Sequence, residues 1–373
     1  MFKTQLRLGK IFGFPVRIDV SWLIVFVWIT WSLADGYFPR NYPSWSAETT
    51  WLLAVLASLL FFGSVLLHEL GHALVARGQG TPVKDITLFM FGGVAEITEE
   101  PSTPERELRM ALVGPLVSLV LSALFAGIHL LTREHNDAIA TVSLFLGGIN
   151  LSLGVFNLIP GYPLDGGRVL RAILWRMRQD LTWATRWASR VGQAVAYVFI
   201  VGGIVRAFSG EWVDGLWIAF IGLFLDGAAR SAYAQLTLRK LLEGHSVREV
   251  MSGECHMLPP QLTLDVLIEQ HLLSGASRCY TVGDSHGVRG LLTIHNVREV
   301  PKVEWPFTHV VDVLTPLEQL RTVQPDTPLW DALRQMTAEG VNQLPVLSDG
   351  ELLGMITREN LITFIRHRSE LGV

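Results

Sequence analysis

The sequence has few charged residues, no excess of basic ones and almost no cysteine. Only 17% of its 373 residues are charged, 50% are hydrophobic, and the mean hydropathy is +0.36. The net charge of -4 gives no basis for nucleic-acid binding. Cys255 and Cys279 match no metal-binding spacing, and we expect reduced, buried thiols if that part of the chain is cytosolic. This composition indicates a membrane protein with a soluble appendage.

Long apolar stretches, by contrast, are abundant. We expect six membrane-spanning helices, at residues 20–34, 51–76, 110–131, 138–160, 191–207 and 215–225. The last is short unless it extends past Asp214 and Asp226. Because further spans follow the first, we expect a retained helix there and not a cleavable signal peptide. Residues 16–20 alternate apolar and charged side chains and predict a strand before the first span.

Lysine and arginine predict the orientation of these spans. They precede the first span and collect after the second, fourth and sixth, whereas the opposite side has Arg40, Arg133 and, depending on where the fifth span ends, Arg206. Because basic residues favour the cytosolic side, we expect both termini in the cytosol and the chain in the cell membrane. The second span then runs from the outer face towards the cytosol.

The second span contains the segment His68-Glu69-Leu70-Gly71-His72. Histidines four residues apart lie on one face of a helix, so both rings can reach a single metal ion. Glu69 follows the first histidine, the spacing that places a carboxylate beside the water of a metal site. Between Trp51 and Ala76 it is the one charged side chain, and a polar triplet at that depth is costly unless it has a function. The pattern favours a metal site over hydrogen bonds that merely join helices.

A catalytic zinc ion usually takes three protein ligands and keeps one position for water, so a third ligand is needed. The fourth span ends in Asn157-Leu-Ile-Pro-Gly-Tyr-Pro-Leu-Asp165-Gly-Gly. The two prolines interrupt the helix and the two glycines let the backbone turn, which places Asp165 near the cytosolic boundary, at the depth of the histidines. We expect Asp165 to be the third ligand. The alternative is a turn aspartate that caps a helix opening at Arg168.

This set of residues suits the hydrolysis of a peptide bond. A zinc ion would activate water and polarise the scissile carbonyl, and Glu69 would pass the proton of the water to the leaving amine. Asn157 would hold the substrate or steady the oxyanion, or else bond to a neighbouring helix. Cobalt or manganese would suit the same ligands.

Residues 84–97 lie between the second and third spans and have a Gly92-Gly93 break. They predict a strand or a tight hairpin close to the metal, the alternative being a surface loop. An open strand edge there could pair with an extended peptide and hold it for cleavage.

With both motifs, the chain resembles the site-2 protease family, the intramembrane zinc metalloproteases. The resemblance covers residues 10–178, with weaker matches at Gly13-Phe-Pro-Val-Arg-Ile-Asp and Gly114-Pro115. It implies that His68, His72 and Asp165 bind zinc, that Glu69 is catalytic and that Asn157 helps to bind substrate. Ser118 stands where many members have an asparagine, so the resemblance gives weaker support for a substrate contact from the third span.

From about residue 231 the composition is that of a soluble protein with an internal repeat. Residues 246, 264 and 288 match residues 309, 329 and 352, offsets of 63 to 65, and each copy predicts strand, helix, strand, strand, helix. The repeat resembles a pair of cystathionine-beta-synthase (CBS) domains, which implies adenine-nucleotide binding through Thr293 and Thr357. Asn296 and Asn360 stand where the family usually has a ribose-binding aspartate. The alternative is a dimerisation module.

We therefore predict an α-helical multi-pass membrane protein with membrane-associated strands and a soluble α/β CBS module. Its parts are an intramembrane zinc metalloprotease at 1–240 and CBS domains at 241–306 and 307–373. The protease would cut a membrane-anchored protein, such as a regulatory factor, within or next to its transmembrane helix, and the CBS pair would modulate access. One rival is a CBS-regulated transporter or channel, which needs polar residues through both halves of the membrane. Another is an inactive scaffold, which the intact histidine motif argues against. The sequence is also compatible with a homodimer.

Overall fold

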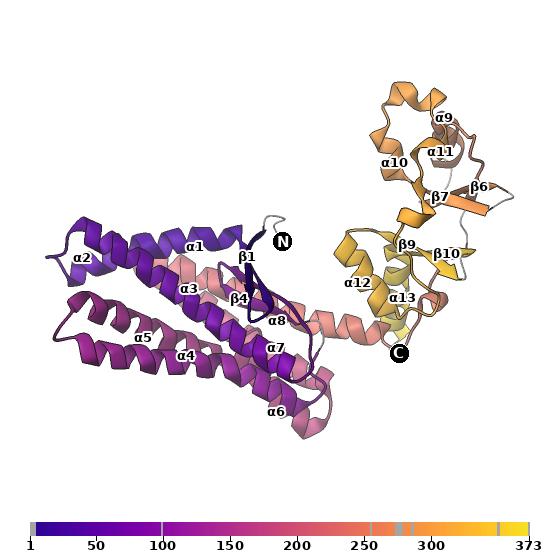
Figure 1. Ribbon diagram of the computed structural model, residues 1–373. Coiled ribbons are helices and arrows are strands. Elements are labelled where there is room, and N and C mark those ends of the chain that lie inside the picture. The colour runs from indigo at the N-terminus through magenta and orange to yellow at the C-terminus, as the bar shows by residue number, and fades with distance from the viewer. Residues whose placement is uncertain are drawn as a thin grey trace. The chain divides into compact units, whose positions relative to one another are not determined.

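A computed structural model describes residues 5–97, 100–253, 256–272, 279–284, 287–348 and 351–371. The chain divides into two compact units, Met1–Ala234 and Gln235–Val373, and the long helix α8 runs across the boundary between them (Figure 1). The predicted domain limits at residues 240 and 306 stay predictions.

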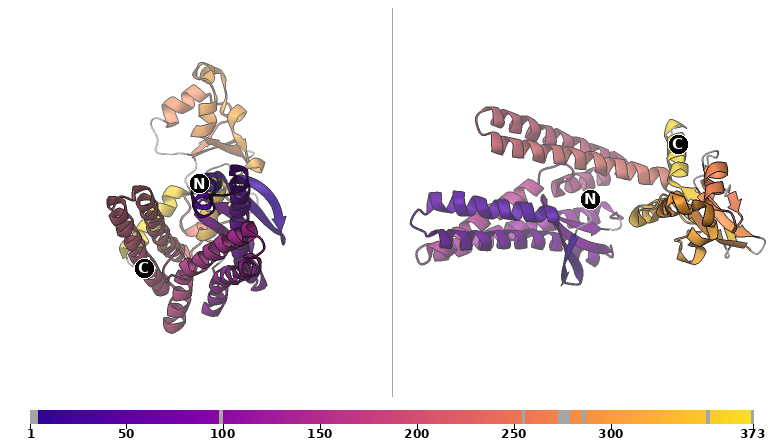
Figure 2. Two further views of the ribbon diagram at one scale, coloured as in Figure 1. Left: turned by 90° about the vertical axis from the view of Figure 1, so that its left-hand side faces the viewer. Right: turned by 90° about the horizontal axis from the view of Figure 1, so that it is seen from above.

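The first unit contains six helices, within its described residues, that are long and apolar enough to cross a membrane. The first begins as α1 (Val20–Trp31) and continues through a π-helical segment (Ser32–Tyr37) into α2 (Phe38–Asn41). The others are α3 (Ala47–Gly78), α4 (Pro104–Thr132), α5 (Asp137–Asn157), α7 (Leu181–Phe208) and α8 (Trp212–Leu242). The predicted six helices are therefore confirmed, and α7 and α8 run side by side as a helical hairpin (Figure 2).

The sixth helix is much longer than its apolar core, because its two aspartates fit the helix. Asp214 lies in the first turn of α8, where a negative charge interacts favourably with the helix dipole. Asp226 accepts a hydrogen bond of 2.9 Å from Arg230, one turn later. Neither residue ends the helix, so the span extends past both.

Capping side chains fix where the other long helices begin. Asp19, Ser46, Thr103, Asn136 and Asp180 precede α1, α3, α4, α5 and α7, and each accepts a hydrogen bond from a backbone N–H of the first turn. Such bonds satisfy donors that have no partner within the helix.

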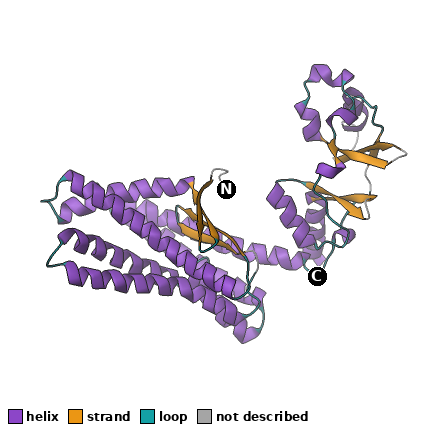
Figure 3. Cartoon of the chain, viewed as in Figure 1, coloured by secondary structure: helices purple, strands orange, loops and turns teal. Residues whose placement is uncertain are grey.

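A four-stranded sheet lies beside one end of α3 (Figure 3). Its strands, in spatial order, are β1 (Gln5–Ile11), β2 (Phe14–Asp19), β3 (Val83–Phe89) and β4 (Gly92–Ile97). The predicted strand before the first span is β2, and residues 84–97 form the tight hairpin β3–β4 and not a surface loop. Because β4 is an outer strand of this sheet, one of its edges has no strand neighbour among the described residues.

A short helix that does not span the membrane, α6 (Asp165–Arg178), follows α5 after an irregular segment at 158–164. It packs against α4 and α7, while α3 packs against α4 and β4. Helices α3, α4 and α6 therefore approach one another at one place, and the site described below is built there.

The second unit contains the predicted repeat. The first copy has β5 (His256–Leu258), α9 (Leu264–Leu267) with a π-helical turn (Ile268–Leu272), β6 (Cys279–Asp284), β7 (Gly287–Thr293) and α10 (Ile294–Glu299). The second has a single bridge at Val323, then α12 (Leu329–Glu339), β9 (Gln343–Ser348), β10 (Glu351–Thr357) and α13 (Arg358–Leu371). The remaining elements are 3-10 turns at Val247–Glu249, Lys302–Phe307 and Leu317–Gln319, α11 (Val310–Val313) and β8 (Thr315–Pro316).

The two copies exchange their leading segments. Val247, at the start of the first copy, is buried in the core of the second, and Val310, at the start of the second, is buried in the core of the first. This exchange buries apolar side chains that neither copy would cover alone.

Candidate metal centre

The structure brings His68, His72 and Asp165 together. Both histidines are buried on the face of α3 that meets α4 and α6, and their Nε2 atoms lie 3.2 Å apart. Oδ2 of Asp165 lies 3.1 Å from each of these nitrogens. Two segments almost a hundred residues apart in sequence thus contribute three potential ligand atoms to one point.

The other nitrogen of each imidazole is also bonded. His72 Nδ1 donates to the Met110 carbonyl at 2.6 Å, so the lone pair of the neutral ring is on Nε2. His68 Nδ1 lies 2.9 Å from Ser118 Oγ. Such partners orient the imidazoles of metal sites and fix their tautomers.

This donor set fits a zinc ion. Two imidazole nitrogens and a carboxylate oxygen are usual zinc ligands. In a tetrahedral site with zinc–ligand bonds of about 2.1 Å, neighbouring ligand atoms are about 3.4 Å apart, close to the separations here. Electron-rich atoms at this spacing repel one another, and a cation between them would remove the repulsion.

Gly114 of α4 leaves space at the same point. A Cβ atom at this position would lie 2.2 Å from His72 Nε2 and 2.5 Å from His68 Nε2. The helix needs no special backbone angle here, so the glycine is required by the close approach of the two rings.

Asp165 is the first residue of α6, and Leu164 occupies the N-cap position. The helix therefore opens at Asp165 and not at Arg168, and the carboxylate contacts the imidazoles. The carboxyl of an aspartate is ionised at neutral pH, as a metal ligand must be.

Gly166 and Gly167 do not form the backbone turn that the sequence predicts. Both lie within α6, and a Cβ on Gly166 would stand 2.3 Å from the Leu158 carbonyl oxygen. One on Gly167 would stand 2.2 Å from the carbonyl carbon of Gly161. The glycines let α6 begin directly against the preceding segment, which holds Asp165 close to α3.

Glu69 lies under strand β4. A Cβ on Gly93 would lie 2.4 Å from Glu69 Cγ, and the backbone N–H of Ala95 bonds to the Glu69 carboxyl. The side chain is partly exposed, unlike those of the two histidines. The carboxyl is thus positioned by the strand that has a free edge.

The asparagines of α5 are bonded within the protein. Asn157 Nδ2 donates to the Leu153 carbonyl at 3.0 Å, and its role in substrate binding stays a prediction. Asn150 is fully buried and donates to Ser64 Oγ of α3 at 3.2 Å, so it links two helices.

In the second unit, Thr357 and Asn360 bond to each other. Asn360 Oδ1 accepts from the Thr357 N–H at 3.0 Å, and the Asn360 N–H donates to Thr357 Oγ1 at 3.1 Å, which caps the start of α13. Asn296 Nδ2 donates to Thr315 Oγ1 at 3.2 Å, and the side chain of Thr293 lies outside the described residues. Nucleotide binding by these four residues stays a prediction.

The sequence did not single out Ser118 as a partner of His68. The available signal was helical spacing, since Ser118 follows Gly114 by one turn on the same face of α4. The sequence does not indicate at which position along their axes α3 and α4 contact each other.

Comparison with known proteins agrees with this geometry. The model of peptidase family M50 matches residues 56–134 and 132–201, and the CBS domain model matches residues 310–367. The Mycobacterium tuberculosis (strain H37Rv) protein named "Putative zinc metalloprotease Rip3" is 35% identical over 367 residues, which are 97% of this chain and 93% of that protein. The chain belongs to peptidase family M50, the site-2 proteases.

Two further matches of this site-2 protease come from Methanocaldococcus jannaschii. "Zinc metalloprotease MJ0392" of Methanocaldococcus jannaschii is 27% identical over 365 residues, 96% of this chain and 95% of that protein. A solved structure, "Site-2 Protease from Methanocaldococcus jannaschii", has 30% identity and a TM-score of 0.43, and the match covers 62% of this chain and 95% of that one. The chain is thus a zinc metalloprotease with a CBS module.

Replacing Gly114 with alanine should abolish zinc binding, because the added Cβ would occupy the space between the ligand nitrogens. Metal analysis of the purified variant should find almost no zinc, in contrast to one ion per chain in the parent. Gly127→Ala on the same helix is a matched control, since a Cβ there meets nothing within 4 Å. A G114A protein with full zinc content would contradict the assignment.

Replacing Ser118 with alanine should weaken zinc binding about tenfold, because His68 would lose the partner that orients its ring. Competition with a chromogenic chelator measures the dissociation constant. Ser122→Ala, one turn further along α4, removes a bond to the Gly147 carbonyl and should leave zinc affinity unchanged. Equal effects of the two substitutions would show that Ser118 contributes only to helix packing.

Proposed function

We propose that this metalloprotease is an intramembrane endopeptidase. It cuts membrane-anchored proteins within or next to their transmembrane helix, with the active site towards the cytosolic face. The observation that carries the proposal is the meeting of His68, His72 and Asp165 on a helix of 32 residues that is apolar enough to cross a membrane. His72 lies six residues before the end of α3, about 9 Å along the axis.

His68, His72 and Asp165 would hold zinc, and Glu69 would transfer the proton of the attacking water. Zinc, when bound, supplies a Lewis acid that polarises a carbonyl and makes water more acidic. Glu69 is positioned to take a proton from the attacking water and to donate it to the leaving amine. Because it adjoins His68 in sequence and lies under β4, its carboxyl lies between the ligand cluster and the strand.

The free edge of β4 is the proposed substrate-binding surface. The amide bonds of a transmembrane helix are hidden in its own hydrogen bonds, so a substrate must unwind before it is cut. An outer strand offers N–H and C=O groups to an extended peptide, which offsets the loss of those helical bonds. Because Ala95 of β4 contacts Glu69, a peptide added to this edge would run beside the catalytic carboxyl.

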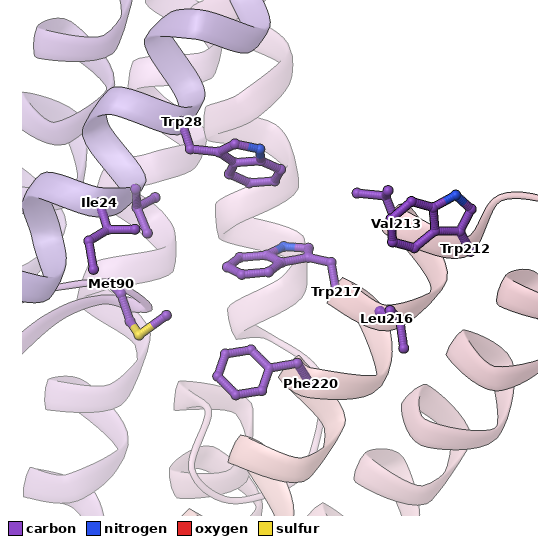
Figure 4. Close-up of a pocket in the computed structure, with 9 residues that line it drawn as sticks. Ile24, Trp28, Met90, Trp212, Val213, Leu216, Trp217 and Phe220 are labelled. Atoms are coloured by element: carbon purple, nitrogen blue, oxygen red, sulfur yellow. The ribbon is translucent and has the colours of Figure 1, made fainter.

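A cavity of about 350 Å³ lies beside the turn that precedes this strand. Its walls come from three elements (Figure 4): Ile24, Val25 and Trp28 of α1, Met90 of the β3–β4 turn, and Trp212, Val213, Leu216, Trp217 and Phe220 of α8. An apolar lining suits the side chains of a transmembrane helix. We propose that substrates pass between α1 and α8.

The CBS pair is proposed to modulate this access from the cytosol, where both termini are expected from the distribution of lysine and arginine. An adenine nucleotide is the proposed ligand. Its test is the effect of added nucleotide on the cleavage rate, with the chain lacking residues 246–373 as the comparison.

Glu69→Gln should keep zinc and lose cleavage by about a hundredfold or more, because the amide cannot accept the proton. A proteomic comparison of membrane fragments in cells that carry the parent or the E69Q chain measures the loss and names the substrates. Glu96→Gln is a matched control, because Glu96 lies on β4 but pairs with Lys84 on the exposed side. Undiminished cleavage by E69Q would show that another residue is the base.

Joining α1 to α8 should stop cleavage of membrane substrates without loss of zinc. The rings of Trp28 and Trp217 have centroids 5.0 Å apart, so cysteines at these positions can be bridged by a bifunctional thiol-specific reagent long enough to replace the two indole side chains. The background needs Cys255→Ser and Cys279→Ser, and the two single-cysteine chains serve as controls. If the bridged protein cuts as fast as its controls, substrates use another route.

A further inference from the structure

The first turn of α4 and the second turn of α6 are joined by a buried ion pair. Arg171 Nε donates to Glu107 Oε1 at 2.5 Å, and a second nitrogen of the same guanidinium also contacts this oxygen. The two side chains are 6% and 0% exposed. Arg171 also lies 3.3 Å from Glu100 Oε2 and over the ring of Tyr162.

A buried ion pair is a poor source of stability, because the cost of removing both charges from water offsets most of their attraction. Its directional bonds do, however, fix how two elements sit against each other. Here two nitrogens of one planar guanidinium converge on a single carboxylate oxygen, which restricts the geometry of the pair. A role in positioning α4 against α6 therefore explains this ion pair better than a contribution to stability.

The ion pair lies next to the metal centre on both helices. Glu107 is one turn before Met110, whose carbonyl oxygen accepts from His72 Nδ1. Arg171 is six residues after Asp165 on α6. Arg168, between them, donates to Met110 Sδ at 3.1 Å, and its Nε lies 4.0 Å from Glu107 Oε1.

Helices α4 and α6 thus hold different parts of one site: α4 orients a histidine ring, and α6 carries the carboxylate. We propose that Glu107 and Arg171 are positioning residues that hold α6 so that Asp165 Oδ2 stays within ligand distance of both imidazoles. This inference rests on the proposed zinc site. Neither residue touches the ligand atoms, so both act through Asp165 and His72.

The chain offers a matched control on the same two helices. Arg176 of α6 lies 3.7 Å from Glu105 of α4, but these side chains are 72% and 51% exposed. An exposed pair of this kind holds little in place, because water and salt screen it. Its removal changes the same charges without loosening the metal centre.

The test compares Glu107→Gln and Arg171→Gln with Glu105→Gln and Arg176→Gln in the full chain. Zinc affinity is measured by chelator competition, and the absorption spectrum of the cobalt-substituted protein reports the ligand set. We expect E107Q and R171Q to bind zinc at least about tenfold more weakly and to change the cobalt spectrum, with the controls unchanged. Arg171→Lys keeps the charge but not the fork, so it should recover part of the affinity. Parental zinc affinity in E107Q and R171Q would overturn the proposal.

Because removing one partner of a buried pair can prevent folding, the double variant Glu107→Met/Arg171→Met is needed as well. Apolar residues of similar volume usually preserve the fold at such positions but impose no direction. The folded double variant should bind zinc more weakly than the parent, and parental affinity in it would also refute the inference.

Asp165→Asn separates this inference from the proposed function. If D165N retains parental zinc affinity, the ligand set itself is wrong. If D165N loses zinc while E107Q, R171Q and the double variant keep it, the zinc site stands and only the positioning role fails.

Discussion

Three electron-rich atoms held about 3.1 Å apart in an apolar helix bundle are the constraint on which the rest of the first unit depends. Lipid would not hold two imidazole rings and a carboxylate together, so the surrounding residues must do it. The Met110 carbonyl and Ser118 orient the rings, and Gly114 leaves the space between them. A cation with a vacancy for water is the group that such a cluster is shaped to bind.

Irregular backbone at membrane depth requires partners within the protein, because lipid offers none. The segment at 158–164 meets this requirement by packing closely against α6 and α7: the Tyr162 N–H donates to the Ala188 carbonyl of α7 at 3.2 Å, and Gly161 touches Gly192. The sheet is likewise placed against α3. Both departures from helix are next to the metal centre, since one delivers Asp165 and the other positions Glu69.

The sequence was sufficient to predict the spans, the strand before them, the repeat, and the residues that converge, because these depend on periodicity, spacing and the cost of polar groups in lipid. It did not reveal Glu107, Arg171 or the bond between Ser118 and His68. These contacts depend on where along their axes two helices meet. An apolar pattern indicates which face of a helix is buried but not this position along the axis. The prediction that Gly166 and Gly167 let the backbone turn was wrong. Their role is a close contact with the preceding segment, and neither segment's sequence alone indicates such a contact.

Different interactions hold the fixed part of the first unit and the part that the proposed substrate route would open. Helices α4 and α6 are joined by buried charges, and separating them would leave each charge without a partner in an apolar surrounding. Helices α1 and α8 meet through aromatic side chains around a cavity, and in lipid such side chains exchange one apolar neighbour for another. Opening at α1 and α8 is therefore the less costly movement. It leaves α3, α4 and α6 in place, so a substrate entering by the proposed route would reach a metal centre that has not moved.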